Sequence, residues 1–378
     1  MPAIADVKAH VLEAKIDEPF WWSFNRSDAR GSCIVEIIAE DGTSGWGECF
    51  GPARLNAAII EAFRPHLLGK DFRAGDLLWQ TLYNQFRDQG QKGLTVTAIS
   101  GVDIALWDLR GRHFEAPVHV LMGGPLRREV KAYATGTYRH GDGDPLDYIC
   151  DEVAGYANEG FSAVKLKIGF GVAQDLALIE AVRETIGPKM GLMLDANHGF
   201  DVLEAVELGN RAAKFDIGWF EEPVVPDELM SYQEVKARQP IPVAGGECEF
   251  TRWGFREVLT RRAIDIIQPD TCAAGGLSEC KKIADMATAF GVRYVPHVWG
   301  TGIGLATALQ LLAVLPHTPP RHSALEPMLE FDRSEHPFRQ AIMMQDIEHA
   351  QGVVQIPDGP GLGIEINRET LEQFRVAN

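Results

Sequence analysis

Five acidic residues and one histidine recur at nearly even intervals through the second half of the chain, 26, 26, 23, 27 and 33 residues apart. Each of the first five closes a short apolar run, such as MGLMLD or VRYVPH. A strand and its following helix take about that much chain, and parallel strands joined by helices place their carboxyl ends on one face. In a (β/α)₈ barrel that face holds the chemistry. The sequence therefore predicts one shared site for six residues: Asp195, Glu221, Glu247, Asp270, His297 and Glu330.

The first three acids offer only oxygen as a ligand atom. Asp195, Glu221 and Glu247 close three successive expected strands, with no histidine or cysteine among them. Hard anionic oxygens favour Mg²⁺ over zinc, with Mn²⁺ as the second choice. Any one of these acids alone is more often a surface carboxylate. As a trio they predict a magnesium site that leaves positions open for water and substrate.

Two lysines share the run SAVKLKIG, one expected strand before Asp195. Lys165 and Lys167 are two positions apart, so both side chains leave the strand on the same side. The flanking residues are apolar, so we expect both ammonium groups to face the barrel interior near its mouth. The alternative is a solvent-facing strand, which a barrel does not offer. Neighbouring buried cations lower each other's pKa, and a lysine with a lowered pKa can act as a base near neutral pH.

Asp270 and His297 close neighbouring expected strands. A carboxylate beside an imidazole sets its tautomer and stabilises the imidazolium, so we expect His297 to be an acid or a base rather than a structural histidine. Glu330 ends the run EPMLE and is expected to contact a substrate carboxylate. Glu326 begins the same run and is an open alternative for that contact.

Together these groups suit the removal of a weakly acidic proton next to a carboxylate. A metal ion and Lys165 would hold the substrate carboxylate and stabilise the charge of the enediolate as it forms. Without that electrostatic help, no side chain is basic enough for the task. The partner implied is therefore a small-molecule carboxylate.

Composition limits the other classes of function. The chain has 378 residues, which is comfortable for two domains, and 46% of them are hydrophobic. Its formal net charge of −17 argues against nucleic acid or an anionic membrane as a partner. No run is long and apolar enough to span a bilayer, and the start lacks the layout of a signal peptide. The six cysteines form no CxxC pair, so we expect reduced thiols in the cytoplasm.

The elements that position the site follow from patterns along the chain. Strand-like runs 34–38 and 45–49 flank Asp41-Gly42, a strong hairpin signal, and residues 55–122 are mostly helical in pattern. Strand-like and helix-like stretches then alternate from Val130, and the last barrel strand is expected within 322–330. The fold class predicted is α/β, a modified TIM-like (β/α)₈ barrel with an N-terminal α+β capping domain that the C-terminal tail completes. The expected boundaries are 1–125 for the capping domain, 126–350 for the barrel and 351–378 for the tail.

The motifs KLK, LDAN, FEEP, GGE, QPD and PHVWG resemble the enolase superfamily, specifically its mandelate racemase and muconate lactonizing branch. Residues 98–124 are similar to the capping-domain signature of that family. Sites of this superfamily use a Lys or His base with Mg²⁺. The resemblance therefore implies the same proton abstraction that the residue types indicate. Carried over position by position, the resemblance implies that the metal ligands are Asp195, Glu221 and Glu247. Lys167 would be the base on one face, and His297 with Asp270 the base on the other. Lys165 would contact the substrate carboxylate, Glu330 would be the electrophile, and Asn197 would be a polar contact.

Within this branch, the stretches KIGFG, WFEEPVVP and IPDGPGLGIEIN resemble cycloisomerases that open the lactone of a sugar diacid by β-elimination. Two loops depart from that pattern: CEFTRWG after Glu247, and EPFWWSFNRSD over 18–28. Capping loops near residues 20 and 50 cover the substrate in this superfamily. Trp21 and Trp22 are therefore candidate substrate contacts, although they, like Phe24, could equally pack between the domains.

Three reactions remain open for the same residues. Expelling a ring oxygen makes the enzyme a cycloisomerase, expelling hydroxide makes it an acid-sugar dehydratase, and exchanging protons between Lys167 and His297 makes it a racemase or epimerase of an α-hydroxy acid. A non-catalytic barrel is a remote fourth reading, because every matched ligand and base position is present. We also expect a homo-oligomer, as relatives usually assemble.

Overall fold

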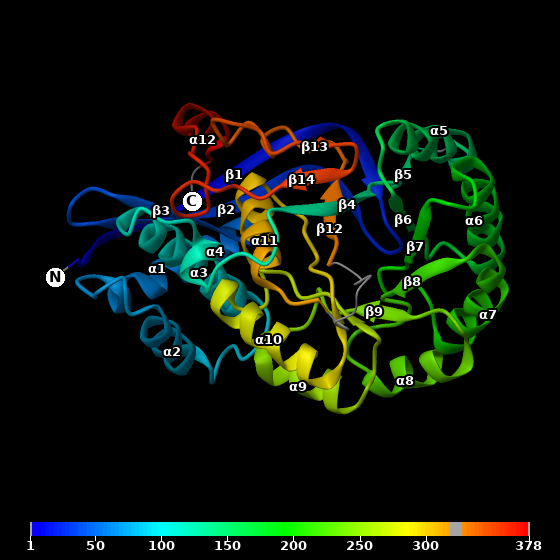
Figure 1. The fold of residues 1–378 in the computed structure, drawn as a ribbon, viewed down its shortest axis with the longest axis horizontal. Helices are drawn as coiled ribbons and strands as arrows, with labels where there is room; N and C mark the ends of the chain where they lie inside the picture. The colour runs from blue at the N-terminus through cyan, green and yellow to red at the C-terminus, as the bar shows by residue number, and fades with distance from the viewer. Residues whose placement is uncertain (1, 142, 318–326, 377–378) are drawn as a thin grey trace.

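The computed structural model describes residues 2–141, 143–317 and 327–376. Figure 1 shows the N-terminal part beside a larger barrel of strands surrounded by helices. The N-terminal part opens with an antiparallel sheet in the order β3-β2-β1, and β5, which follows the first barrel strand in the chain, pairs with the end of β1. Its hairpin turns at Asp41-Gly42 as predicted, with Gly42 at φ 86° and the Thr43 amide donating to Asp41 Oδ1 at 2.9 Å. These strands are β1 (Ile4–Trp21), β2 (Arg26–Ala39), β3 (Ser44–Cys49) and β5 (Arg139–His140).

One helix of this part, α3, is buried on nearly every side. Its sequence is apolar around the whole circumference, which is typical of a helix enclosed by other elements. Strand β3 lies against it through Gly45 and Gly47, where an added Cβ would come within 2.2 Å of the Ala105 carbonyl and 2.0 Å of the Gly101 carbonyl. Only glycine allows this approach. The helices here are α1 (Ala53–Leu67), α2 (Gly75–Phe86), α3 (Leu94–His113) and α4 (Val118–Leu121).

The described residues form eight parallel barrel strands, which confirms the predicted fold class. Neighbours pair in the order β11-β10-β9-β8-β7-β6-β4, and β12 pairs with the other edge of β4. Aromatic and aliphatic side chains of consecutive strands, among them Tyr133, Met193 and Trp219, fill the barrel interior. The strands are β4 (Glu129–Thr135), β6 (Ala163–Lys167), β7 (Gly191–Asp195), β8 (Ile217–Glu221), β9 (Val243–Gly245), β10 (Ile266–Ile267), β11 (Arg293–Tyr294) and β12 (Leu329–Asp332).

Helices cover the outside of the barrel (Figure 1). Local capping explains where some of them begin: Asp144 precedes Pro145 and accepts from the Leu146 amide, while Asp201 and Glu204 form a capping box. These helices are α5 (Pro145–Asn158), α6 (Val172–Ile186), α7 (Val202–Ala212), α8 (Leu229–Arg238), α9 (Thr251–Thr260), α10 (Gly276–Phe290) and α11 (Gly302–Val314), with a 3₁₀ turn at Ala213–Phe215.

Two buried carboxylates of the N-terminal part hold the starts of two barrel helices. Glu48 accepts from the Thr301 hydroxyl at 2.7 Å and from the Gly304 amide at 2.9 Å, at the start of α11. Asp103 accepts from the Ser278 amide at 2.9 Å and the Ser278 hydroxyl at 2.6 Å, in the first turn of α10. Helix N-termini carry unpaired amides and partial positive charge, so the carboxylates stabilise the junction between the two parts.

The C-terminal segment contacts both parts. Strand β14 pairs antiparallel with the start of β4, the Leu362 amide donates to Asp108 of α3, and the Val376 amide donates to the Val11 carbonyl of β1. Its elements are β13 (His349–Ala350), β14 (Val353–Gln355) and α12 (Arg368–Phe374). In Figure 1 this segment runs across the N-terminal sheet toward the chain's end.

One boundary expected from sequence was wrong. The last barrel strand was placed within 322–330, but β12 begins at Leu329 and runs to Asp332, because its register with β4 extends to Thr135.

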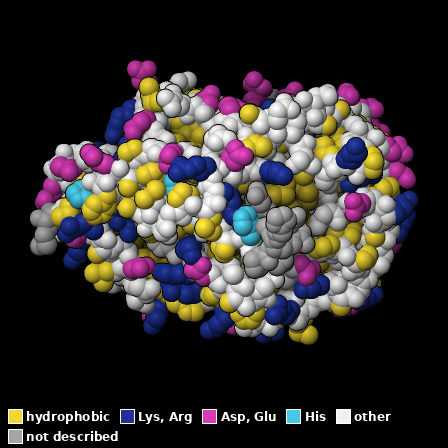
Figure 2. All heavy atoms as spheres, in the orientation of Figure 1, with side chains coloured by type: hydrophobic (Ala, Val, Ile, Leu, Met, Phe, Trp, Pro, Cys, Tyr) yellow, Lys and Arg dark blue, Asp and Glu magenta, His cyan; other side chains and the backbone are white. Residues whose placement is uncertain are grey.

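Among the described helices, none combines the length and the apolar character that crossing a membrane requires. Figure 2 shows basic side chains interspersed with acidic and hydrophobic ones on this face.

Candidate active site

The structure brings the six predicted residues together at the carboxyl ends of the strands. Asp195 and Glu221 are the last residues of β7 and β8, and Glu247 follows β9 by two positions. Asp270 and His297 lie beyond β10 and β11 and pair with each other through an isolated parallel bridge. Glu330 is the second residue of β12 rather than its last. All but Glu247 are buried.

Both lysines point into this cluster from β6. Lys165 Nζ lies 2.5 Å from Glu221 Oε1, 2.7 Å from Glu330 Oε1 and 3.6 Å from Asp195 Oδ2. Lys167 Nζ lies 2.5 Å from Asp195 Oδ2 and 2.9 Å from Asn197 Oδ1. Of the two acids in the EPMLE run, Glu330 lies at ion-pair distance from Lys165. Glu326, the alternative for the substrate contact, lies outside the described residues.

The expected pKa of the lysines was wrong in sign. Burial lowers the pKa of Lys165 and of Lys167, and each lysine was expected to lower the other's further. The surrounding carboxylates outweigh both effects, so the pKa of Lys167 is raised, chiefly by Asp195, and that of Lys165 is raised well above its usual value, chiefly by Glu221 and Glu330. With this set of neighbours both ammonium groups are charged.

His297 lies between two acids. Its Nδ1 is 2.7 Å from Asp270 Oδ2 and its Nε2 is 3.3 Å from Glu247 Oε2. Burial would lower the pKa of the imidazole, but the charge of Glu247 and the hydrogen bond with Asp270 raise it to about 10. The neighbouring Val298 amide donates to Glu330 Oε2 at 3.0 Å and ties the last two strands together.

The three predicted metal ligands have different surroundings. The two lysines hold the pKa of Asp195 near 2 against the effect of burial, whereas burial raises the pKa of Glu221 to about 7 despite Lys165. Within the described ranges, their ligand atoms are not gathered within 4.8 Å of one another. Five carboxylates here face two ammonium groups and one imidazole, so negative charge is left over. Hard oxygen donors with excess negative charge fit a divalent cation such as Mg²⁺.

Sequence reasoning missed several groups that hold this cluster. Glu221 Oε2 accepts from Trp219 Nε1 at 2.9 Å and from Gln268 Nε2 at 2.6 Å. The Tyr138 ring faces Lys167, with its centroid 5.4 Å from Nζ. Gln268 begins the QPD motif, so its place two residues before Asp270 was the available signal. Tyr138 follows β4 and had none.

The loop after β1 reaches the mouth of the barrel. The Ser23 hydroxyl donates to the Asn197 carbonyl at 2.7 Å. Trp22 packs against Trp299 and Tyr138, with ring centroids 6.3 and 6.4 Å apart. Phe24 covers His198 at 5.7 Å. This loop therefore closes over residues next to the site.

The two candidate tryptophans have different neighbours. Trp22 belongs to an aromatic group that reaches His297 through Trp299 and Phe50, whose ring lies 5.6 Å from the imidazole. Trp21 is the last residue of β1 and carries Arg26 over its ring at 5.1 Å, and both tryptophans line an outer groove together with Arg139. Of the pair, Trp22 has the closer connection to the candidate bases.

Comparisons with known proteins agree with this architecture. Residues 5–123 match the profile described as the mandelate racemase / muconate lactonizing enzyme N-terminal domain, and residues 149–370 match the enolase C-terminal domain-like profile. The chain is 53% identical over 373 residues, 99% of each chain, to D-galactarolactone cycloisomerase of Agrobacterium fabrum. It is 34% identical, over 90% of each chain, to arabinonate dehydratase of Saccharolobus solfataricus.

Solved structures give the same result. The crystal structure of 3,6-anhydro-D-galactonate cycloisomerase from Zobellia galactanivorans superposes with a TM-score of 0.91 at 39% identity, covering 99% of this chain and 100% of that one. A racemase from Streptomyces coelicolor with bound magnesium superposes with a TM-score of 0.88 at 26% identity, over 99% and 100% of the two chains.

Proposed function

Because the chain belongs to the mandelate racemase and muconate lactonizing enzyme family of the enolase superfamily, we propose that it opens a lactone of galactaric acid by β-elimination. It is an enzyme of acid-sugar chemistry, as its relatives are. The substrate is taken from the relative of 53% identity, and the reaction class is supported by the site.

One arrangement carries the proposal. Two basic side chains stand at the ends of an arc of strands, Lys167 on β6 and His297 after β11, and the strands between them bear the carboxylates. A substrate carboxylate held over that arc would present its α-carbon to a base on either side. Lys167 would then take the α-proton, and His297, held by Asp270, would serve as the proton donor.

The elimination balances without any co-reactant. The C–H bond next to the carboxylate breaks and its electrons form the enediolate. The bond between the β-carbon and the ring oxygen then breaks, and that oxygen leaves as part of a new carboxylate. The resulting enol takes one proton at the former β-carbon and releases its hydroxyl proton to solvent, which gives a 3-deoxy-2-keto diacid that is an isomer of the lactone.

Lys165 and Glu330 would orient the substrate. Their ion pair of 2.7 Å places a fixed positive charge and a hydrogen-bonding acid beside the carboxylate cluster. Asn197, which accepts from Lys167, would hold that ammonium group on the substrate side. Trp22 and, further out, Trp21 would cover the substrate from the N-terminal loop.

Asp195, Glu221 and Glu247 are the residues that would hold Mg²⁺, with Mn²⁺ as a substitute. When bound, such a cation would neutralise these acids, lower the pKa of the lysine beside them and stabilise negative charge on the substrate carboxylate. The leftover negative charge of the cluster supports this choice.

Proton NMR in D₂O with Mg²⁺ tests the function directly, with galactaric acid lactones offered beside free aldonic and aldaric acids. We expect a lactone to become the 3-deoxy-2-keto diacid with one deuterium at the new methylene, while the free acids stay intact. Consumption of a free acid instead would make the enzyme a dehydratase, as its arabinonate-dehydratase relative is named. Deuterium at the α-carbon without elimination would make it a racemase or epimerase.

We also propose a homo-oligomer in the cytoplasm. The six cysteines are unpaired, and four are buried, which suits a reducing compartment. Light scattering of the purified chain and fractionation of cells that express it test the two statements separately.

A further inference from the structure

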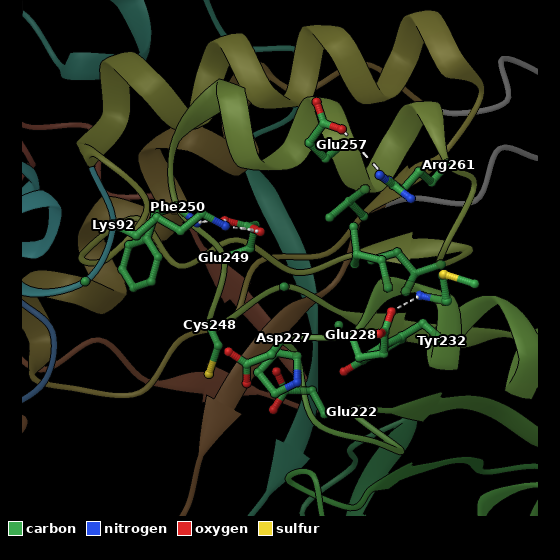
Figure 3. A pocket seen from close by; sticks show the side chains of 18 residues that line it. Lys92, Glu222, Asp227, Glu228, Tyr232, Cys248, Glu249, Phe250, Glu257 and Arg261 are labelled. Atoms are coloured by element: carbon green, nitrogen blue, oxygen red, sulfur yellow. Dashed lines mark hydrogen bonds and ion pairs between the residues drawn. The ribbon is translucent and has the colours of Figure 1, made fainter. Parts of the chain in front are cut away.

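A cavity of about 820 Å³ opens beside the candidate active site, between the loops that follow β8 and β9. Figure 3 shows its lining, with Cys248, Asp227 and Glu222 at one end. The wall is acidic: its basic residues Lys92 and Arg261 are both paired, with Glu249 at 2.7 Å and Glu257 at 3.9 Å. Such a cavity attracts cations rather than anionic substrates.

Three ligand atoms of different chemistry meet at that end. His198 Nε2 lies 3.2 Å from Glu222 Oε2 and 3.8 Å from Cys248 Sγ, and the three atoms are all within 4.8 Å of one another. Among the described residues, this is the one group of three His, Cys, Asp or Glu side chains whose ligand atoms lie within that distance. In a tetrahedral zinc site with bonds of about 2.0–2.3 Å, neighbouring ligand atoms are roughly 3.3–3.7 Å apart. The observed spacing is near that geometry.

Glu222 lacks the partners that a buried carboxylate needs. Its side chain is 1% exposed, and neither oxygen accepts a hydrogen bond, although His198 Nε2 is near one of them. The other imidazole nitrogen, His198 Nδ1, is also buried without a hydrogen-bond partner. A buried carboxylate without hydrogen-bond partners is unfavourable, and a cation bound to it would remove that cost.

We propose that His198, Glu222 and Cys248 form a second divalent-metal site, separate from the three-carboxylate site, for a borderline ion such as Zn²⁺ or Co²⁺. One nitrogen, one oxygen and one sulfur suit such ions, whereas the all-oxygen set suits Mg²⁺. The cavity would supply water for the fourth position. Each ligand is adjacent in sequence to a candidate active-site residue, Asn197, Glu221 or Glu247. An ion bound here would therefore cross-link the three loops that carry them.

The test uses the full chain, stripped of metal and then kept in excess Mg²⁺ so that the carboxylate site is filled. Co²⁺ is titrated while its absorption spectrum is recorded, because a cobalt–thiolate bond gives a charge-transfer band that oxygen and nitrogen ligands do not. We expect one equivalent of Co²⁺ to give this band. The band should vanish in Cys248→Ser, and binding should weaken at least tenfold in His198→Ala. The matched control Cys150→Ser, also partly exposed, should keep it.

A second measurement avoids variants altogether. Zn²⁺ added in the presence of Mg²⁺ should protect Cys248 from alkylation by iodoacetamide, read by peptide mass spectrometry, and should leave Cys150 as reactive as before. Absence of the cobalt–thiolate band, its persistence in Cys248→Ser, or unprotected Cys248 with Zn²⁺ present would each overturn the proposal. None of these readouts depends on turnover, so they stand whatever the substrate is.

Discussion

Lys167 and Asp195 are directly opposite each other in the register of two parallel strands, and Lys167 Nζ lies 2.5 Å from Asp195 Oδ2. The next pair in the same row is Asp195 with Glu221. A candidate base and two candidate metal ligands are thus placed by backbone pairing alone. Because each sits at a strand end, none depends on a long flexible loop for its position.

Removing either candidate base should slow elimination strongly and leave the fold intact. Lys167→Ala and His297→Asn are each expected to lower kcat by about 10²–10⁴, the usual contribution of a general acid or base. Turnover of galactaric acid lactone is measured beside thermal unfolding. The exposed Lys189→Ala is the matched control and should match wild type. A fully active Lys167→Ala would remove that residue from the mechanism.

Removing divalent metal should stop the reaction. We expect a chelator to abolish turnover, and Mg²⁺ or Mn²⁺ to restore it. Glu247→Gln keeps the shape of the side chain but removes one ligand charge, so Mg²⁺ binding measured by calorimetry should weaken by at least tenfold, on the order seen when metal-site residues are changed. Exposed Glu40→Gln should bind Mg²⁺ normally. Full activity after exhaustive chelation would rule out the metal.

Glu36 should make stability depend on acid pH. Burial would raise its pKa, but hydrogen bonds from His10, Arg368 and Ser44 lower it to about 2 from 4.5. Since the folded pKa is depressed, this stabilisation is present above about pH 4.5 and is lost as pH falls toward 2. The upper limit of this stabilisation is about 3 kcal/mol, and solvent screening lowers it because the Arg368 side chain is exposed.

The check is urea unfolding of Glu36→Gln at a series of pH values. The variant should be less stable than wild type at pH 7, and the difference should shrink as pH falls from about 5 to 2. A constant difference across that range would mean that the carboxylate charge contributes nothing.

Glu48 should contribute more to stability than an exposed helix cap. Glu48→Ala leaves the hydroxyl of Thr301 and the amides of Thr301 and Gly304 without their acceptor in a buried junction, so we expect a loss of about 3–5 kcal/mol. Asp201→Ala removes the exposed cap of α7 and should cost about 1 kcal/mol. Both are measured by urea denaturation, and equal losses would contradict the junction's role.

Two glycine substitutions should have opposite effects. Gly47→Ala would place a Cβ 2.0 Å from the Gly101 carbonyl, so β3 must separate from α3 and the protein should be strongly destabilised. Gly155 lies in α5 with nothing within 4 Å of an added Cβ, so Gly155→Ala should stabilise by about 0.5–1 kcal/mol. The thermal unfolding temperature of both variants is measured. A Gly47→Ala variant as stable as wild type would mean that β3 and α3 can separate without cost.

The sequence alone was sufficient for the barrel and for the face of the barrel that holds the candidate site. Apolar runs closed by Asp195, Glu221 and Glu247 are local features, and the alternation of strand and helix allows few topologies. The Asp41-Gly42 turn is equally local. The motifs then identified the family. Strand ends were less certain, as Glu330 shows, because pairing partners decide where a strand stops.

Only the tertiary structure decided which charged groups meet. Whether the pKa of Lys167 rises or falls depends on the carboxylates around it, and Asp195 of β7 and Glu247 beyond β9 come from separate parts of the chain. Glu48 meets Thr301 across 253 residues, and His198 meets Cys248 across 50. Contacts of this kind follow from how elements pack in three dimensions, and no local pattern in the sequence records them.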